Sequence, residues 1–356
     1  MKTSKYSLSI LTFLTAAGLL AGGCQREPIQ PAEDGIRFLV DDEWHSGDGA
    51  ATKAALFDAG ALAGGSFAVN AYLNGGTSKY IDSDVASYKS ATSDWRFDDD
   101  YYWPMAPSTL DFMAWMPASR ANTCVGVPTC TAANGPSFTV TDYPVTSSGQ
   151  STLQEFVYAY KTGQSKAAQG ASGVTLAFRR PFAQLNFQVK TAHQNIHINT
   201  ITFKGIKRNG TFTHNSPDAS PAVPSAWTSL SNSSNLVITV GVDLAAGAVF
   251  SAAQLTSFGL PFLVIPQSYT ATDQIEISLQ RPTGSTAETI TVSNPITAWE
   301  AGKSYTYSLD LSDEIRFSVA IQDWSTGTVY NEIIFVLTAE GWVADTTNSK
   351  DVDFGE

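Results

Sequence analysis

The sequence predicts an all-β protein made of two β-sandwich domains in tandem, immunoglobulin-like or transthyretin-like, with few and short helices. Three observations lead to this expectation. Apolar and polar residues alternate with a period of two in many short runs, and clusters of Gly, Asn, Pro and Ser separate these runs. The chain has 356 residues, which is enough for about two domains once a removable N-terminal segment is subtracted. Two sheets that each bury one apolar face form a sandwich.

The alternating runs place one set of side chains on a buried face and the other set in water. They are found in both halves of the chain: Phe67, Val69 and Ala71; Leu185, Phe187 and Val189; Leu236, Ile238, Val240 and Val242; Ile275, Ile277 and Leu279; Tyr305, Tyr307, Leu309 and Leu311. Residues 153–160 carry the one short pattern with helical spacing. Residues 216–234, rich in Ser, Pro and Asn, are expected to form a loop between strands.

Residues 161–173 interrupt the alternation with Gly, Gln, Ser and Ala. We therefore place an N-terminal β-sandwich domain at residues 36–173 and a C-terminal β-sandwich domain at residues 174–344. The remaining residues 345–356 form an acidic tail.

The composition excludes several classes of function. There are 21 Lys and Arg against 33 Asp and Glu, a formal net charge of −12, which is unfavourable for binding the phosphates of nucleic acid. A hydrophobic content of 43% excludes disorder for most of the chain. The acidic net charge leads us to expect no nucleic-acid partner. Because there are only four His and three Cys, we also expect no metal and no cofactor.

The first residues determine where the protein is sent. Lys2 and Lys5 precede an apolar run over residues 8–20 that is too short for a membrane-spanning helix, so residues 1–23 are predicted to be a signal peptide rather than a retained anchor. The small residues before Cys24 are typical of a bacterial lipobox, which predicts lipid attachment at Cys24. Residues 24–35 then form a tether to the membrane.

An exported protein occupies a compartment where disulfides persist. Cys124 and Cys130 bracket a turn-forming stretch, and we expect them to pair. A zinc site is the alternative, but no His lies within sixty residues of either cysteine.

The candidate catalytic patterns fail on inspection. His193 and His197 have the spacing of a helical zinc protease, but Gln194 stands where a general-base Glu is needed, and the surrounding isoleucines predict a strand. No nucleophile elbow or triad pattern is visible. We therefore expect that the protein is not an enzyme.

Two other clusters have both a functional and a structural interpretation. Asp94 and residues 98–100, all Asp, could bind a hard cation, but the calcium-loop spacing is missing, so a solvated turn is the alternative. Aromatic side chains nearby could stack on sugar rings or belong to a core strand: Tyr101, Tyr102, Trp103 and Trp115.

Several short segments after the lipobox occur in the same order as in a known protein family. They are residues 51–54 (ATKA), 67–72 (FAVNAY), Trp95 with 101–104 (YYWP) and 110–115 (LDFMAW), 173–185 (GVTLAFRRPFAQL), 263–267 (LVIPQ) and 299–307 (WEAGKSYTY). In these segments the chain resembles the fimbrillin family, the type V pilus subunits and related surface lipoproteins of Gram-negative anaerobes. The resemblance extends over nearly the whole chain.

The resemblance implies a surface-exposed lipoprotein of the outer membrane and of the fimbrium, which polymerises with other pilin subunits by strand exchange. A protease would remove a strand at residues 36–40 by cutting at Arg37 or Lys53, although Lys53 stands where the family has arginine. The donor strand would carry these alternating residues: Val329, Asn331, Ile333, Phe335 and Leu337. The alternative is that this run completes its own domain.

The leading hypothesis is a lipid-anchored pilus subunit or pilus-associated adhesin, with a host or bacterial surface ligand left open. The competing hypothesis is a surface glycan-binding lipoprotein that does not polymerise. It requires an exposed row of tryptophans, so burial of Trp95, Trp103 and Trp115 would remove its main support.

Overall fold

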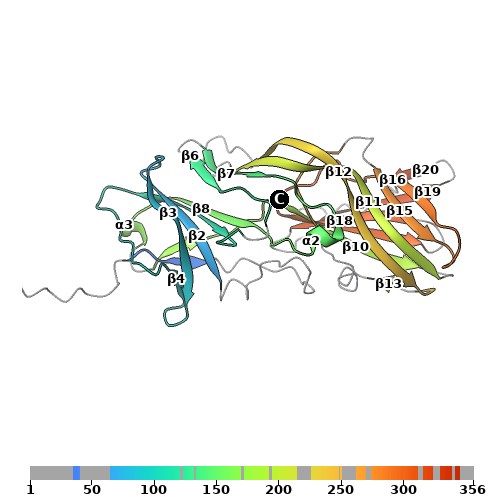
Figure 1. Cartoon of the computed structure of the whole chain (residues 1–356), viewed down its shortest axis with the longest axis horizontal. Coiled ribbons are helices and arrows are strands. Elements are labelled where there is room, and N and C mark those ends of the chain that lie inside the picture. The colour runs from blue at the N-terminus through green and yellow to red at the C-terminus, as the bar shows by residue number, and fades with distance from the viewer. Residues whose placement is uncertain are drawn as a thin grey trace, which may run out of the picture. The chain divides into compact units, whose positions relative to one another are not determined.

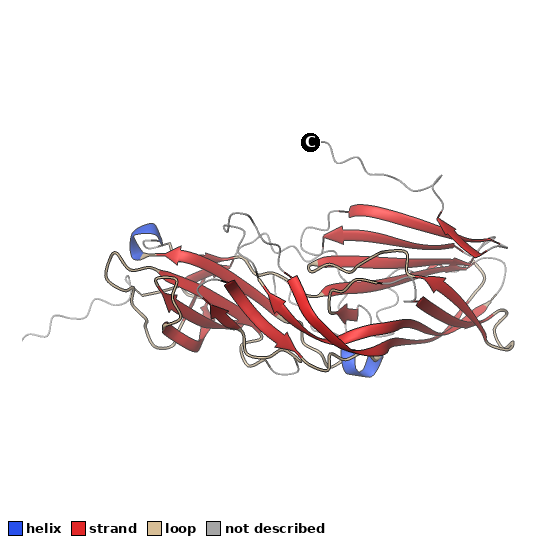
Figure 2. Ribbon diagram, turned by 90° about the horizontal axis from the view of Figure 1, so that it is seen from above, coloured by secondary structure: helices blue, strands red, loops and turns tan. Residues whose placement is uncertain are grey.

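The computed structural model describes the following residues: 35–40, 65–120, 123–131, 134–169, 172–191, 195–214, 226–247, 249–250, 262–269, 274–311, 316–323, 329–338 and 341–344. Strands dominate these residues, and the two helices among them, α2 (Ser147–Gln150) and α3 (Lys166–Gln169), have four residues each (Figures 1 and 2). The predicted all-β class is confirmed. In this described part of the chain, no helix is long and apolar enough to cross a membrane.

The first sheet has seven strands in the order β8-β5-β2-β3-β4-β1-β9. Their bounds are β1 Phe38–Val40, β2 Ser66–Leu73, β3 Lys79–Lys89, β4 Asp94–Arg96, β5 Leu110–Met116, β8 Val157–Gln164 and β9 Val174–Leu176. All neighbours are antiparallel except β1 and β9, which run parallel.

The central strands of the first sheet are buried on both faces. Phe67 and Val69 of β2 belong to one apolar core, whereas Ala68 and Tyr72 of the same strand belong to a second core that includes Phe138. A strand covered on both sides has no polar face, which explains why β2 and β5 have nearly continuous apolar sequences.

The remaining strands form two further sheets. The second sheet has the order β16-β15-β11-β7-β6, with β12 also paired to β11, and the third has the order β13-β10-β17-β18-β19-β20, with β14 also paired to β10. The bounds in the second sheet are β6 Thr129–Thr131, β7 Asn134–Val140, β11 Ile196–Thr213, β12 Ala226–Leu244, β15 Gln274–Gln280 and β16 Glu288–Ser293. Those in the third are β10 Ala183–Thr191, β13 Val249–Phe250, β14 Phe262–Val264, β17 Lys303–Leu311, β18 Arg316–Asp323, β19 Val329–Thr338 and β20 Gly341–Ala344.

One apolar core joins the second and third sheets. It contains alternating residues of β10, β11, β12, β15 and β17, among them Phe187, Phe203, Leu236, Ile277 and Tyr307. Because each strand contributes every second side chain, the sequence alternation in this half of the chain predicted these buried faces correctly.

Strands β11 and β12 are long, and they pair with each other along most of their length. The first part of β11 pairs with β15, whereas its last four residues pair with β7, which comes from the N-terminal half of the chain. The loop expected at residues 216–234 is wrong for residues 226–234, which belong to β12. Their side chains are mostly exposed or half-buried, so the apolar alternation that marks a strand is missing.

The helical spacing in residues 153–160 also does not correspond to a helix, since β8 begins at Val157. The division into two domains at residue 173 stays a prediction. The pairing shows that β9, which lies just beyond this boundary, hydrogen-bonds to β1 in the first sheet.

Candidate functional site

Strand β1 is an internal strand of the first sheet, although it lies close to the N-terminus. Phe38 is opposite Trp95 of β4 on one side and Val174 of β9 on the other. The backbone N–H of Ile36 donates to the Tyr101 carbonyl at 2.7 Å, and the Val174 N–H donates to the Arg37 carbonyl at 2.9 Å. Both edges of this short segment are therefore occupied.

The side chain of Phe38 is fully buried in an aromatic cage. Its ring contacts those of Phe67, Phe97 and Phe112 edge to face, at centroid distances of 5.7, 5.7 and 5.3 Å. Ile36 is buried on the same side. Burial of these two side chains contributes about 3–6 kcal/mol, and the edge-to-face geometry is the one that aromatic quadrupoles favour.

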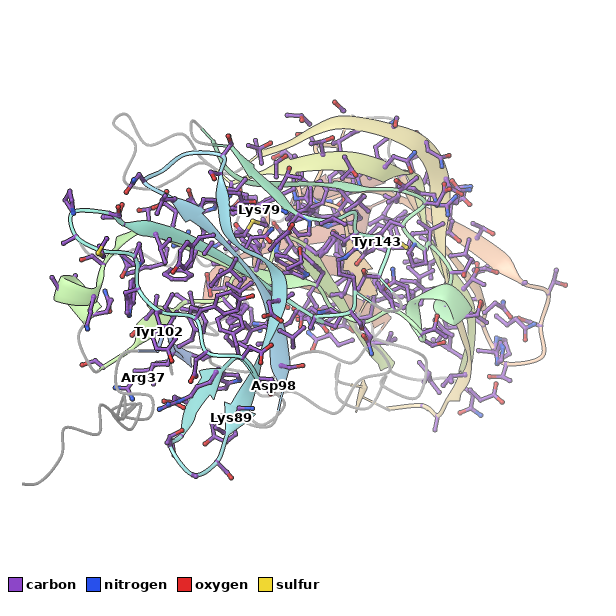
Figure 3. All side chains as sticks on the ribbon, turned by 60° about the vertical axis from the view of Figure 1, so that its left-hand side comes forward. Arg37, Lys79, Lys89, Asp98, Tyr102 and Tyr143 are labelled. Atoms are coloured by element: carbon purple, nitrogen blue, oxygen red, sulfur yellow. The ribbon has the colours of Figure 1, made fainter. Side chains whose placement is uncertain are left out.

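Arg37 lies between these two apolar residues, on the other side of the strand, and its side chain is 24% exposed. Its guanidinium is 3.7 Å from a carboxylate oxygen of Asp94. Burial acts to raise the pKa of Asp94, but hydrogen bonds from Arg96 and Thr92 and the charges of Arg96 and Arg37 outweigh it, so the pKa of Asp94 is lowered. Figure 3 shows Arg37 near Tyr102, consistent with the β-bridge between Gly35 and Tyr102.

Gly173 allows β9 to approach β1 closely. Its φ is +89°, and a Cβ atom there would lie 3.0 Å from Cγ and 3.1 Å from the carbonyl oxygen of Arg37. Sequence reasoning missed this role and the place of β9 beside β1. The glycine before the Val174–Leu176 run is the signal in the sequence, although it fits the predicted domain boundary at residue 173 equally well.

Arg37, one of the two candidate cleavage residues, is thus held in the sheet by backbone hydrogen bonds. Lys53, the other candidate, and Cys24, the predicted lipid attachment residue, lie outside the described residues. Proteolytic processing and lipidation stay predictions.

The predicted donor run corresponds to β19. Its backbone pairs with β18 from Val329 to Val336 and with β20 from Phe335 to Thr338. In this structure the strand therefore belongs to the third sheet of its own chain. Whether it is donated to a second copy stays a prediction.

The predicted disulfide between Cys124 and Cys130 is not formed. The carbonyl of Cys124 accepts a hydrogen bond from the N–H of Thr141, whereas Cys130 pairs with Pro136. Thr141 and Pro136 are five residues apart along an extended strand, a distance of about 16 Å. The cysteines opposite them are separated by a similar distance, whereas a disulfide needs Cα atoms within about 7 Å. The segment between the cysteines runs extended alongside β7 and does not turn back, so the two thiols stay apart.

The aromatic residues do not form an exposed row of tryptophans. Trp95 and Trp115 are buried, at 7% and 2% exposure, and Trp103 packs partly buried against the Phe38 core. Tyr102 is the exposed member of the predicted group, at 49%. The glycan-binding hypothesis loses the tryptophan row on which it depended.

Two residues of the acidic cluster, Asp94 and Asp98, and one of the two candidate histidines, His197, have protein partners. Asp94 is buried beside arginines, and Asp98 lies 2.9 Å from the Lys89 ammonium (Figure 3). His197 lies in β11, with Nδ1 2.7 Å from an Asp243 oxygen, while His193 is outside the described residues. Within the described ranges, no three His, Cys, Asp or Glu residues are grouped as metal ligands.

The structural comparisons give weak similarities. A fimbrial protein from Bacteroides vulgatus shares 14% identity with a TM-score of 0.49, covering 82% of this chain and 99% of that one. A fimbrial assembly protein from Parabacteroides distasonis shares 14% identity with a TM-score of 0.41, covering 83% of this chain and 97% of that one. The tip fimbrial protein Mfa3 from Porphyromonas gingivalis shares 10% identity with a TM-score of 0.35, covering 73% of this chain and 94% of that one. No curated protein matches the chain.

The family comparison is decisive by its extent. The model of the fimbrillin-like family matches residues 52–324, well over half of the chain. This matched stretch begins after β1 and ends just beyond β18, so it includes the strands on both sides of β1 and most of the sandwich formed by the second and third sheets. The chain belongs to the fimbrillin-like family.

Proposed function

We propose that this chain is a lipid-anchored pilus subunit or pilus-associated adhesin that assembles by proteolytic loss of its N-terminal strand and by donor-strand exchange. Family membership supports the general role in a fimbrium at the cell surface. The finer mechanism is supported by one observation: β1 is a buried internal strand, yet it precedes the whole matched region.

Cleavage between β1 and β2 would leave β1 held by non-covalent contacts alone. Lys53 lies in this interval, because β1 ends at Val40 and β2 begins at Ser66. Loss of β1 would expose the unpaired backbone edges of β4 and β9. It would also uncover the cage around Phe38, and an open strand edge beside an apolar groove is a template for another strand.

Strand β19 is the candidate occupant of this groove. Its five alternating residues are Val329, Asn331, Ile333, Phe335 and Leu337. Burying side chains of this size at about 1.5–3 kcal/mol each gives on the order of 10 kcal/mol before the cost of ordering the donor. Such a joint is strong enough to hold subunits in a fibre.

Lipidation at Cys24 would attach the uncut chain to the outer membrane. Cys24 precedes both candidate cleavage residues in the sequence. Cutting at Arg37 or Lys53 would therefore separate the body of the subunit from its lipid. Other pilin subunits, identical or related, are the expected partners.

Limited trypsin digestion followed by native gel electrophoresis tests the proposal. The cut wild-type protein should form a ladder of oligomers, whereas Lys53→Gln should delay the ladder if Lys53 is the processed residue. Lys161→Gln is a matched control, because Lys161 is an exposed residue of β8 far from this interval in the sequence. A protein that stays monomeric after cleavage at Lys53 would contradict strand exchange, whereas cleavage after Arg37 alone leaves β1 (Phe38–Val40) attached to the rest of the chain.

A further inference from the structure

We infer that the groove left by β1 selects its occupant by one phenyl ring, and that Phe335 of a second copy takes the place of Phe38. In this register the donor runs parallel to β9 and antiparallel to β4. The inference rests on the proposed strand exchange and adds the residue that sets its register.

The strand that leaves the groove and the strand that would enter it match in sequence. Residues 36–40 read Ile-Arg-Phe-Leu-Val, and residues 333–337 read Ile-Ile-Phe-Val-Leu. The buried face of β1 carries Ile36 and Phe38, and β19 repeats both residue types at the same spacing. The two strands are therefore alike at every position except that of Arg37.

The groove is demanding at the position of Phe38. Three phenyl rings, those of Phe67, Phe97 and Phe112, meet the Phe38 ring edge to face. A smaller side chain would leave a cavity among these rings, and a polar one would be buried without a partner. A shift of the donor by two residues would place Ile333 or Leu337 in the cage, and a shift by one would place Ile334 or Val336 there. Each of these side chains is smaller than a phenyl ring and lacks its aromatic edge.

The one chemical difference is tolerated by the surroundings of Arg37. If Ile334 replaced Arg37, Asp94 would keep its hydrogen bonds from Arg96, at 2.9 and 2.8 Å, and from Thr92. The Arg37 contact, at 3.7 Å, is the longest of the set. The buried carboxylate would therefore not lose its principal partners.

Strand β18 is the competitor within the chain, because residues 315–319 read Ile-Arg-Phe-Ser-Val. Its backbone, however, is paired along its length on both sides, with β17 and with β19, and Val319 is buried in the core. Strand β19 is paired with β18 on one edge, while β20 covers only Phe335–Thr338 on the other. Release of β19 therefore breaks fewer backbone hydrogen bonds.

The register makes a specific contact testable. In β1, Leu39 is opposite Thr175 of β9, and Thr175 is exposed. The inferred register places Val336 opposite Thr175. Full-length chains that carry Cys24→Ser, Cys124→Ser and Cys130→Ser provide a background without other thiols.

The experiment mixes two such chains, one with Thr175→Cys and one with Val336→Cys, after limited trypsin digestion and under mild oxidation. We expect a disulfide-linked pair on a non-reducing gel that disappears on reduction. Ile334→Cys reports a two-residue shift and Ser318→Cys reports donation by β18. Cross-linking of Thr175→Cys to either of these in preference to Val336→Cys overturns the register, whereas the absence of any oligomer overturns the proposed strand exchange and the inference with it.

A peptide competition keeps the test independent of variant folding. The synthetic peptide of residues 331–339 should block oligomer formation by the cut wild-type protein. The same peptide with Ala in place of Phe335 should require at least a tenfold higher concentration. Equal potency of the two peptides overturns the role of the phenyl ring.

Discussion

The ring of Phe38 contacts that of Phe112 edge to face at a centroid distance of 5.3 Å. Phe112 belongs to β5, which is not a hydrogen-bonded neighbour of β1 in the first sheet. The sheet therefore curls enough for side chains of non-adjacent strands to meet, and β1 is tied to the fold by its side chains as well as by its backbone.

Truncation of Phe38 should be costly because it empties the aromatic cage. Phe38→Ala is expected to lower the free energy of unfolding by about 3–5 kcal/mol, measured by urea denaturation of the uncut protein. Phe38→Leu fills part of the space and should cost less. A loss below about 1 kcal/mol for the alanine variant would mean that β1 is not packed in this cage.

Alanine substitutions at two glycines with positive φ distinguish the cost of backbone strain from the cost of a steric clash. A Cβ at Gly173 meets Arg37, whereas one at Gly163, with φ +64°, meets nothing within 4 Å. We expect Gly173→Ala to cost about 2–5 kcal/mol and Gly163→Ala about 1–2 kcal/mol. Equal costs in thermal or urea unfolding would contradict the close approach of β9 to β1.

His214 should make stability depend on pH below neutrality. Burial, with the Arg179 charge as a second cause, lowers the pKa of His214 from 6.5 to about 4, and Nδ1 is 3.0 Å from the Tyr158 hydroxyl. Between these two pH values the unfolded chain binds a proton that the folded chain does not. Stability is therefore unaffected above pH 6.5 and falls as the pH drops toward 4, by about 3 kcal/mol.

Urea denaturation at pH 7 and pH 4.5 measures this effect. The difference between the two pH values should shrink in His214→Gln relative to the wild type. His197→Gln serves as the control, because His197 is partly exposed beside Asp243. If His214→Gln shows the same difference as the wild type, the pKa of the wild-type His214 imidazole is not lowered by folding.

The cysteines should behave as thiols in the folded protein. Burial raises the pKa of both Cys124 and Cys130, and the Cys130 thiol shares a hydrogen bond with Tyr160. We expect non-reducing peptide mapping to find no link between them, and dithiothreitol to leave the urea midpoint unchanged. A midpoint that falls on reduction would indicate a disulfide that this fold does not contain.

Sequence reasoning succeeded where a strand buries one face. In β10, Leu185, Phe187 and Val189 are buried as their alternation predicts, and β15 repeats the pattern with Ile275, Ile277 and Leu279. It failed where a strand is exposed or covered on both faces. The first part of β12 has no buried face and was expected to be a loop, and Ala68 and Tyr72 of β2 enter a second core that period-two alternation does not predict.

Only part of the candidate site was predictable from local sequence patterns. The strand at residues 36–40 was identified from its sequence, but its neighbours were not, because β4 and β9 are three-residue strands far apart along the chain. The cysteine pairing failed because proximity in sequence was taken for proximity in space, although an extended segment carries its ends apart.

By itself, the sequence determined the all-β class, the buried faces of the regular strands and the segments typical of the fimbrillin family, because these depend on residue type and local periodicity. Only the tertiary structure decided that β1 lies between β4 and β9, that β7 joins the second sheet, and that Phe38 is enclosed by three phenyl rings. The physical reason is that strand pairing is made through backbone groups that every residue possesses, so which strands become neighbours depends on how the whole chain packs.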